Sequence, residues 1–185
     1  YVTAKIAVSK NKLIYSEKER KITDTTSDKL SHYLRYKNDA ILITSRTLNT
    51  DNPKLNCRLK NYESFSPIRI ILDKNLEINL NSNIFKTSKE NNTIIFYKSS
   101  NNLKINILKK KGINLIKLKL NSGKYFDFKI IFKKLYLLGI RNLLIEGGDK
   151  LTKNLLKSGL IDCFYLFKSP KNLLKGKKSV FFTSS

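Results

Sequence analysis

The stretch 143–149, Leu-Leu-Ile-Glu-Gly-Gly-Asp, constrains the fold of this chain more than any other. An apolar run ends in Glu146, passes through Gly147 and Gly148, and enters a segment with helical spacing at 150–158. A buried strand that turns through two glycines into a helix brings bare backbone N–H groups and a helix N-terminus to one point, which suits a phosphate. Glycines at such a position can also serve only the backbone turn and bind nothing, so the rest of the sequence must distinguish a phosphate site from a simple turn.

The apolar pattern along the chain predicts strands that alternate with helices. Buried strands are expected at 2–9, 39–44, 67–73, 93–97, 113–118, 141–146 and 162–168. Amphipathic spacing predicts helices at 25–35, behind a capping box at 25–28, at 127–138, ended by Gly139, and at 150–158. Residues 45–53, 81–92 and 98–104 are rich in polar residues and are expected to be loops. This alternation predicts a three-layer α/β domain with a mostly parallel central sheet flanked by helices, in which ligands sit beyond the C-terminal strand ends.

Composition narrows the class of protein. The chain has 185 residues, enough for one domain with a real core, and no apolar run of the ~18–20 residues that span a membrane. Two separated cysteines and one histidine favour neither a zinc site nor a disulfide framework, so a reduced cytoplasmic compartment is expected. Methionine is absent and the chain opens inside an alternating apolar run, so we expect a piece of a longer protein.

The net charge of +23 leaves two interpretations open. A strongly basic domain can be a nucleic-acid-binding module. The lysines, however, are spread along the whole length, which favours solvated surface and argues against a nucleic-acid partner. In either case a positive field attracts small polyanions such as phosphorylated substrates and dinucleotides.

A few side chains could carry chemistry. Lys5 interrupts an apolar strand and faces either outward from an edge strand or inward toward a phosphate or carboxylate, possibly Glu146. Glu146 is an acid at the end of an apolar strand, which is unusual without a role. Arg35 ends the first predicted helix, where a cation suits the dipole, and His32 is a lone helical histidine, solvated or packed. With no Ser-His-Asp arrangement or metal cluster, the polar loops suit hydride transfer by a bound dinucleotide.

Several ordered segments together resemble the reductase domain of the bifunctional riboflavin-biosynthesis deaminase/reductase, a member of the dihydrofolate-reductase-like fold. They are TAKIAVS at 3–9, IT at 22–23, LR at 34–35, DAILI at 39–43 with Thr47, Asp51, Pro53, Leu55 and Arg58 behind it, IRIILD at 68–73, IEGG at 145–148, GLID at 159–162 and PKNLLKG at 170–176. The resemblance covers nearly the whole chain. It implies that residues 1–185 form one reductase domain, which a zinc deaminase domain precedes in the full protein.

The resemblance also implies a reaction and a site. NADPH would reduce the ribosyl group of 5-amino-6-(5-phosphoribosylamino)uracil to a ribityl chain, by hydride transfer to C1 of an opened, imine-like sugar. Lys5 and Glu146 would be catalytic, and the substrate would also contact Glu19, Arg35, Leu55 and Arg58. The residues implied for NADPH are Ala7, Lys21, Thr23, Thr47, Asp51, Lys74, Gly147, Gly148, Asp149 and Lys150. Family reductases are commonly homodimers.

Some positions depart from the family pattern. The usual Trp is Lys21, the second Asp of the family's Asp-Asp-Pro is Asn52, and a Ser near the substrate is Glu19. The family's Ser after the Leu-Asp that ends the predicted strand 67–73 is Lys74 here, the cation we expect beside the 2′-phosphate of NADPH. A non-catalytic relative of the reductase is therefore the alternative within the family.

Overall fold

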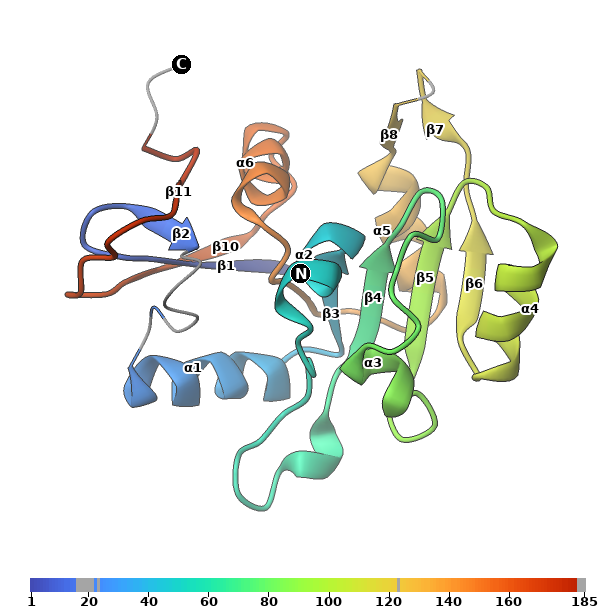
Figure 1. Ribbon diagram of the computed structural model, residues 1–185, viewed down its shortest axis with the longest axis horizontal. Coiled ribbons are helices and arrows are strands. Elements are labelled where there is room, and N and C mark those ends of the chain that lie inside the picture. The colour runs from blue at the N-terminus through green and yellow to red at the C-terminus, as the bar shows by residue number, and fades with distance from the viewer. Residues whose placement is uncertain (16–21, 23, 123, 183–185) are drawn as a thin grey trace.

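The computed structural model describes residues 1–15, 22, 24–122 and 124–182, and a seven-stranded sheet forms its centre (Figure 1). The strand order is β10-β1-β9-β3-β4-β5-β6, and all six neighbouring pairs are parallel. The strands are β1 (Val2–Val8), β3 (Ala40–Thr44), β4 (Ile68–Leu72), β5 (Thr93–Tyr97), β6 (Asn114–Lys117), β9 (Leu143–Ile145) and β10 (Cys163–Lys168). The predicted α/β class is thus confirmed, with a fully parallel main sheet.

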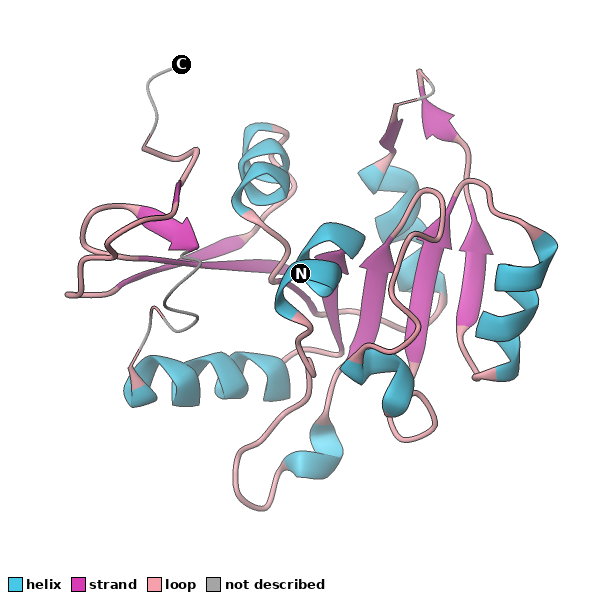
Figure 2. Cartoon of the chain, viewed as in Figure 1, coloured by secondary structure: helices cyan, strands magenta, loops and turns pink. Residues whose placement is uncertain are grey.

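Helices cover both faces of this sheet (Figure 2). One core cluster joins alternate strand residues such as Leu42, Ile70 and Phe96 to side chains of α5 (Phe128–Leu137) and α6 (Asp149–Lys157). The other joins the intervening strand residues to α1 (Thr25–Tyr36), α2 (Ser45–Asp51), α3 (Asn83–Lys86) and α4 (Asn102–Lys110). Because successive strand residues point to opposite faces, strands covered on both sides read as continuous apolar runs, and this made them predictable.

The insertion of β9 between β1 and β3 creates the crevice of the fold. The chain moves outward from β3 to β6 and then returns to place β9 beside β1. Ala4 and Leu42 are both in register with Ile145, so Glu146 leaves the sheet level with Lys5 and Ile43. Such a reversal of strand order leaves an open crevice at the C-terminal strand ends.

Several local predictions were wrong, mostly because a side-chain cap turned a polar segment into a helix. The 45–53 segment is the helix α2, whose N-cap Thr44 accepts from the N–H of Thr47. Asn101 likewise caps α4, and α3 lies inside 81–92, so these segments are not plain loops. The cap of α1 is Asp24, which accepts from the N–H of Ser27, so the predicted box at 25–28 lies inside the helix.

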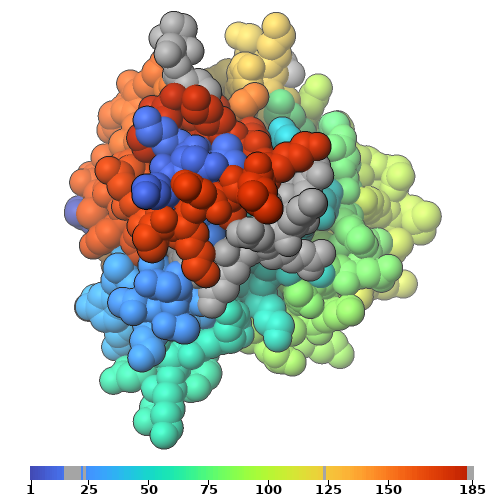
Figure 3. All heavy atoms as spheres, turned by 60° about the vertical axis from the view of Figure 1, so that its left-hand side comes forward, coloured from blue at the N-terminus to red at the C-terminus, as the bar shows by residue number. Residues whose placement is uncertain are grey.

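Small antiparallel pairs lie outside the main sheet and had no clear sequence signal. They join β2 (Leu13–Tyr15) to β11 (Lys177–Lys178) and β7 (Leu120–Asn121) to β8 (Tyr125–Phe126), and a 3-10 turn, η1, spans Glu63–Phe65. Asn11 exchanges hydrogen bonds with the backbone of Leu173, which fastens the C-terminal segment to the start of the chain (Figure 3). Within the described part of the chain, no helix has the length and apolar character needed to cross a membrane.

Candidate functional site

A cleft of about 990 Å³ opens at the C-terminal ends of β1, β9 and β3. Its walls come from the strand ends, α2, the start of α6, the segment around Lys74 and Tyr125, and the C-terminal segment. Most of the predicted site residues among the described ones line it: Lys5, Ala7, Thr47, Asp51, Leu55, Lys74, Glu146, Gly147, Gly148, Asp149 and Lys150. The site thus lies at the switch in strand order, as expected for an open parallel sheet.

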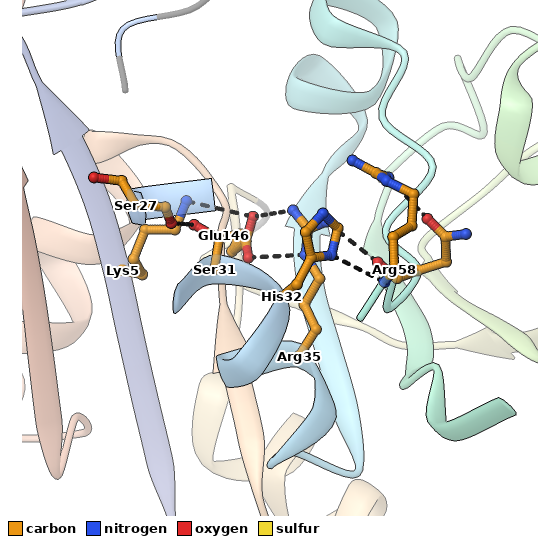
Figure 4. A network of polar contacts seen from close by, with 8 residues as sticks. Lys5, Ser27, Ser31, His32, Arg35, Arg58 and Glu146 are labelled. Carbon is orange, nitrogen blue, oxygen red and sulfur yellow. Dashed lines mark hydrogen bonds and ion pairs between the residues drawn. The ribbon is translucent and has the colours of Figure 1, made fainter. Parts of the chain in front are cut away.

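Glu146 is held between two cations at the base of this cleft (Figure 4). Arg35 donates from Nε to Oε1 at 3.2 Å and from Nη2 to Oε2 at 2.9 Å, a bidentate pair. The Nζ of Lys5 lies 3.7 Å from Oε2. The three side chains are 10–15% exposed. Because β1 lies between β10 and β9, Lys5 is not on an edge strand, and the inward interpretation of Lys5 is correct.

This geometry fixes the charge of Glu146. Burial alone would raise the pKa of its carboxyl, but the charges of Lys5 and Arg35 outweigh burial and lower that pKa to about 2. Glu146 also raises the pKa of the Arg35 guanidinium against the opposing effect of burial. Glu146 is therefore ionised at neutral pH, so it can stabilise a positive charge or accept a hydrogen bond but has no proton to give.

The turn after Glu146 needs both glycines. A Cβ on Gly147 would lie 3.1 Å from the Cα of Ile43 and 3.0 Å from Cδ2 of Leu151, so any larger residue would force the turn, β3 or Leu151 to shift. Gly148 has φ +47° and is the N-cap residue of α6, with no side chain to cap the helix. The first N–H groups of α6 are thereby left without a side-chain cap at the cleft wall, which favours an anion there.

The carboxylate of Asp149, which was expected to contact the cofactor, is bonded by the protein's own C-terminal segment. It is 2% exposed, and its carboxylate accepts from the N–H of Val180 at 2.8 Å and from Lys177 Nζ at 3.4 Å. Lys153 of the same helix donates to the carbonyl of Val180. The first turn of α6 is thus braced by the C-terminal segment, which also brings Lys177 to the cleft.

The opposite wall carries hydroxyls, a carboxylate and further cations. The hydroxyls of Thr44 and Thr47 lie 3.2 Å apart at the start of α2, and Asp51 ends that helix. Lys74 follows β4, donates to the carbonyl of Lys124 and lies 5.2 Å from the ring centre of Tyr125. An aromatic ring beside a cation and hydroxyls can accommodate a planar base and its phosphates.

The segment before β4 forms the edge of the site beside α1. Leu55 is buried, has φ +54° and lines the cleft. Arg58 does not line it: its side chain is exposed, and Nη1 donates to Oδ1 of Asn56 at 3.0 Å. Arg35 likewise lies behind Glu146 and is not part of the cleft lining.

The structure does not test every predicted residue, and it adds others. The predictions at Glu19, Lys21 and Thr23 fall outside the described residues. The cleft-lining residues that the sequence did not single out include Arg46, Thr50, Tyr125 and Lys177. The position of Arg46 one residue before Thr47 was a usable signal, whereas Lys177 was indistinguishable from the many surface lysines. Among the described residues, no group of three or more His, Cys, Asp or Glu side chains could hold a metal ion.

Comparison of the sequence with known proteins finds relatives that match most of the chain. A model of the RibD C-terminal domain matches residues 1–183. The chain is 37% identical over 155 residues to the riboflavin biosynthesis protein RibD of Aquifex aeolicus, covering 84% of this chain and 41% of that protein. It is 34% identical over 154 residues to the 5-amino-6-(5-phosphoribosylamino)uracil reductase of Buchnera aphidicola subsp. Acyrthosiphon pisum, covering 75% and 69%.

Solved structures agree in fold. Acinetobacter baumannii RibD superposes with a TM-score of 0.82 at 22% identity, covering all of this chain and 50% of that one. The chain thus spans about two fifths of the Aquifex RibD sequence and half of the Acinetobacter RibD chain.

The depressed pKa of Glu146 predicts an acid-sensitive fold. Its stabilising contribution is complete above the ordinary glutamate pKa of 4.5 and is lost as pH falls toward the folded value of about 2. The full loss is about 3 kcal/mol. Urea unfolding of wild type and Glu146→Gln between pH 7 and 2.5 measures it. The stability difference between the two should shrink across this window, and a constant difference would contradict the account.

Proposed function

Since the chain belongs to the RibD C-terminal domain family, we propose that it is a reductase of riboflavin biosynthesis that uses NADPH. Its substrate is 5-amino-6-(5-phosphoribosylamino)uracil, whose ribosyl group becomes a ribityl chain. The similar Buchnera protein carries this substrate in its name, and a similar Debaryomyces hansenii protein is named for reduction of a closely related ribosylaminopyrimidinone phosphate. Residues 1–185 act together as one reductase domain.

The observation that carries the proposal is the ionised Glu146 between Lys5 and Arg35, next to the Gly147–Gly148 turn in one cleft. Reduction of a sugar joined to an amine passes through a cationic, iminium-like carbon. A fixed carboxylate stabilises that cation, and a neighbouring ammonium interacts with the sugar oxygens. A cleft with both groups and an anion-binding turn can hold the sugar and a dinucleotide together.

The residues present fit a dinucleotide. Gly147 lets a pyrophosphate approach the backbone, the start of α6 offers N–H groups, and Lys74 and Lys150 add positive charge at the cleft wall. The volume of about 990 Å³ is at the upper end for ligand sites, as a dinucleotide plus a sugar phosphate requires. When bound, NADPH supplies the hydride. Lys74 is the proposed partner of its 2′-phosphate.

The protein's own groups prepare the sugar for that hydride. In the proposed reaction the bond between C1 and the ring oxygen breaks, the oxygen takes a proton from solvent and becomes a hydroxyl, and the nitrogen lone pair forms a double bond to C1. Lys5 donates a hydrogen bond to a sugar oxygen during this step, and Glu146 stabilises the resulting cation. Hydride addition to C1 then neutralises the cation, and NADP⁺ and the ribityl amine leave.

The phosphate end of the substrate lies toward Leu55 and Arg58 in this proposal. The Arg58 side chain is exposed and lies three residues after the cleft-lining Leu55, so its guanidinium is available to pair with a phosphate at this edge of the cleft. Arg35 supports this region from behind, because its Nη1 donates to the carbonyl of Asn56. The proposed enzyme works in the cytoplasm on small molecules, without a nucleic-acid partner.

The first test is turnover. NADPH oxidation with the deaminated ribosylaminopyrimidine phosphate should be measurable for wild type and should fall about 10²–10³-fold in kcat for Glu146→Gln, the range for loss of a key electrostatic group. Glu63→Gln, an exposed glutamate on η1, is the matched control and should keep full activity. A folded wild type that never oxidises NADPH with this substrate would refute the proposal and favour a non-catalytic relative.

Gly147→Ala should weaken the cofactor site. Its Cβ must push the turn away from the backbone of Ile43, so we expect the Kd for NADPH to rise at least about tenfold and the free energy of unfolding to fall by about 1–3 kcal/mol. Gly139→Ala is the control, because its φ of +87° also costs stability but its Cβ would meet nothing within 4 Å. Unchanged NADPH fluorescence titrations for Gly147→Ala would contradict the proposed cofactor position.

We also propose that the chain forms a homodimer. The edge strand β10 carries the half-exposed Tyr165, and Tyr1 and Tyr33 are exposed on neighbouring elements. An apolar face beside an open strand edge favours self-association. Light scattering should give about twice the chain mass of 21.4 kDa, and Tyr165→Asp should shift it toward the monomer. A wild-type mass of one chain at micromolar concentration would exclude the dimer.

A further inference from the structure

The only histidine of the chain, His32, has a specific hydrogen-bonding position beside the site (Figure 4). It lies on α1, three residues before Arg35, and is 9% exposed. Its Nδ1 lies 3.2 Å from the backbone nitrogen of Arg58. A backbone N–H can only donate, so Nδ1 is the acceptor and the proton of the neutral ring is on Nε2.

His32 and Arg35 together hold three consecutive residues of the neighbouring segment. Arg58 donates its N–H to the His32 ring, the Cys57 thiol lies 3.7 Å from the His32 carbonyl, and Arg35 Nη1 donates to the Asn56 carbonyl at 3.3 Å. The segment 56–58 is therefore fastened to one face of α1 at three successive points. His32 and Arg35 can both contact this segment because helix positions three residues apart lie on the same face.

The same segment is connected to Glu146 through Arg35. One guanidinium bonds both oxygens of Glu146 and the carbonyl of Asn56, so a shift of segment 56–58 alters the setting of the buried carboxylate. Leu55, directly before the segment, lines the cleft in a left-handed conformation. Its position depends on where residues 56–58 are held.

We propose that His32 is a positioning residue, which as a neutral Nε2–H imidazole holds segment 55–58 as the wall of the substrate site and releases it on protonation. The expected effect on substrate binding rests on the proposed reductase function, whereas the hydrogen bond between His32 and Arg58 does not depend on it. His32 is not among the residues that line the cleft, and it acts through Arg58, Asn56 and Arg35.

Protonation opposes the hydrogen bond between His32 and Arg58. The imidazolium has a hydrogen on both ring nitrogens, so its Nδ1–H would point at the N–H of Arg58, and two donors repel. The charged groups around the ring are Arg35 on its own helix, Arg58 on the attached segment and Glu146 at the end of β9, and the Cys57 thiol lies on the attached segment as well. Burial, followed by the charges of Arg35 and Arg58, lowers the pKa of His32, against smaller opposing effects of the Asn56 backbone and of Glu146.

The lowered pKa of His32 sets the direction of the pH effect. Because the folded-state pKa lies below the ordinary 6.5, the unfolded chain binds the proton more readily. The neutral clamp is complete above pH 6.5 and is lost as pH falls through the lowered value. The enzyme should therefore lose substrate affinity on the acid side while Glu146, with its pKa near 2, is still ionised.

The hydrogen bond can be tested without any turnover. Since the chain has one histidine, ¹⁵N-labelled imidazole gives a single unambiguous NMR spin system. We expect the Nε2–H tautomer at pH 7.5 and a titration midpoint below 6.5. An Nδ1–H tautomer, or a midpoint at or above 6.5, would overturn the inference.

Kinetics of two variants test the positioning role. His32→Asn keeps an acceptor, Oδ1, close to the place of Nδ1 but cannot titrate, whereas His32→Leu keeps the bulk and removes the acceptor. At pH 7.5, His32→Leu should raise KM for the ribosylaminopyrimidine phosphate about three- to tenfold with kcat within about twofold, because the wall binds substrate uniformly. His32→Asn should keep KM within about twofold.

The pH profiles separate positioning from simple packing. As pH falls from 7 to 5, the ratio of the wild-type KM to the KM of His32→Asn should rise. Titration of the substrate phosphate affects both enzymes equally and cancels in this ratio. A ratio that does not change with pH, or equal losses in both variants, would refute the positioning role. If the NMR result is as expected but no variant oxidises NADPH, the proposed reductase function fails while the His32–Arg58 contact stands.

Discussion

A buried carboxylate between two cations is the interaction on which the arrangement of this molecule depends. Glu146 comes from the end of β9, Lys5 from the middle of β1 and Arg35 from the last turn of α1. None of these charges could be buried alone, because each would incur a desolvation cost of several kcal/mol. Their pairing brings together the end of β9, the middle of β1 and the last turn of α1. The result is a fixed negative charge, ionised at neutral pH, at the base of the cleft.

The remaining cleft follows from how the chain leaves that carboxylate. Gly147 passes so close to β3 that a side chain would meet the backbone of Ile43, and Gly148 then starts α6 without a side-chain cap. The carboxylate of Asp149 accepts a hydrogen bond from the N–H of Val180 in the C-terminal segment, which holds the first turn of α6 in place. The strand β3 and the C-terminal segment thereby hold in place a turn whose uncapped N–H groups suit an anion.

Much of this was predictable from the sequence, and the exceptions have physical reasons. Strands buried on both faces appear as apolar runs, so β3, β4 and β5 were predicted within a residue or two. The sequence left it open whether Lys5 faces outward or toward Glu146, because the register between strands that are distant in the sequence is set by the fold. The helices α2 and α4 were missed because Thr44 was assigned to the end of a strand and Asn101 to a loop, whereas both are N-caps whose side chains accept from the backbone of the following helix. For His32, the packed alternative is the right one, but its acceptor role depends on a backbone N–H twenty-six residues away.

The most direct measurement of the central claim follows the transferred hydrogen. NADPH carrying deuterium at the reactive face of nicotinamide C4 should leave one deuterium at C1 of the ribityl product when the chain acts on the ribosylaminopyrimidine phosphate. This result is expected if the cleft holds the dinucleotide and the sugar together beside Glu146. Product that contains only solvent hydrogen at C1, formed by folded protein with either face of NADPH labelled, would contradict the account.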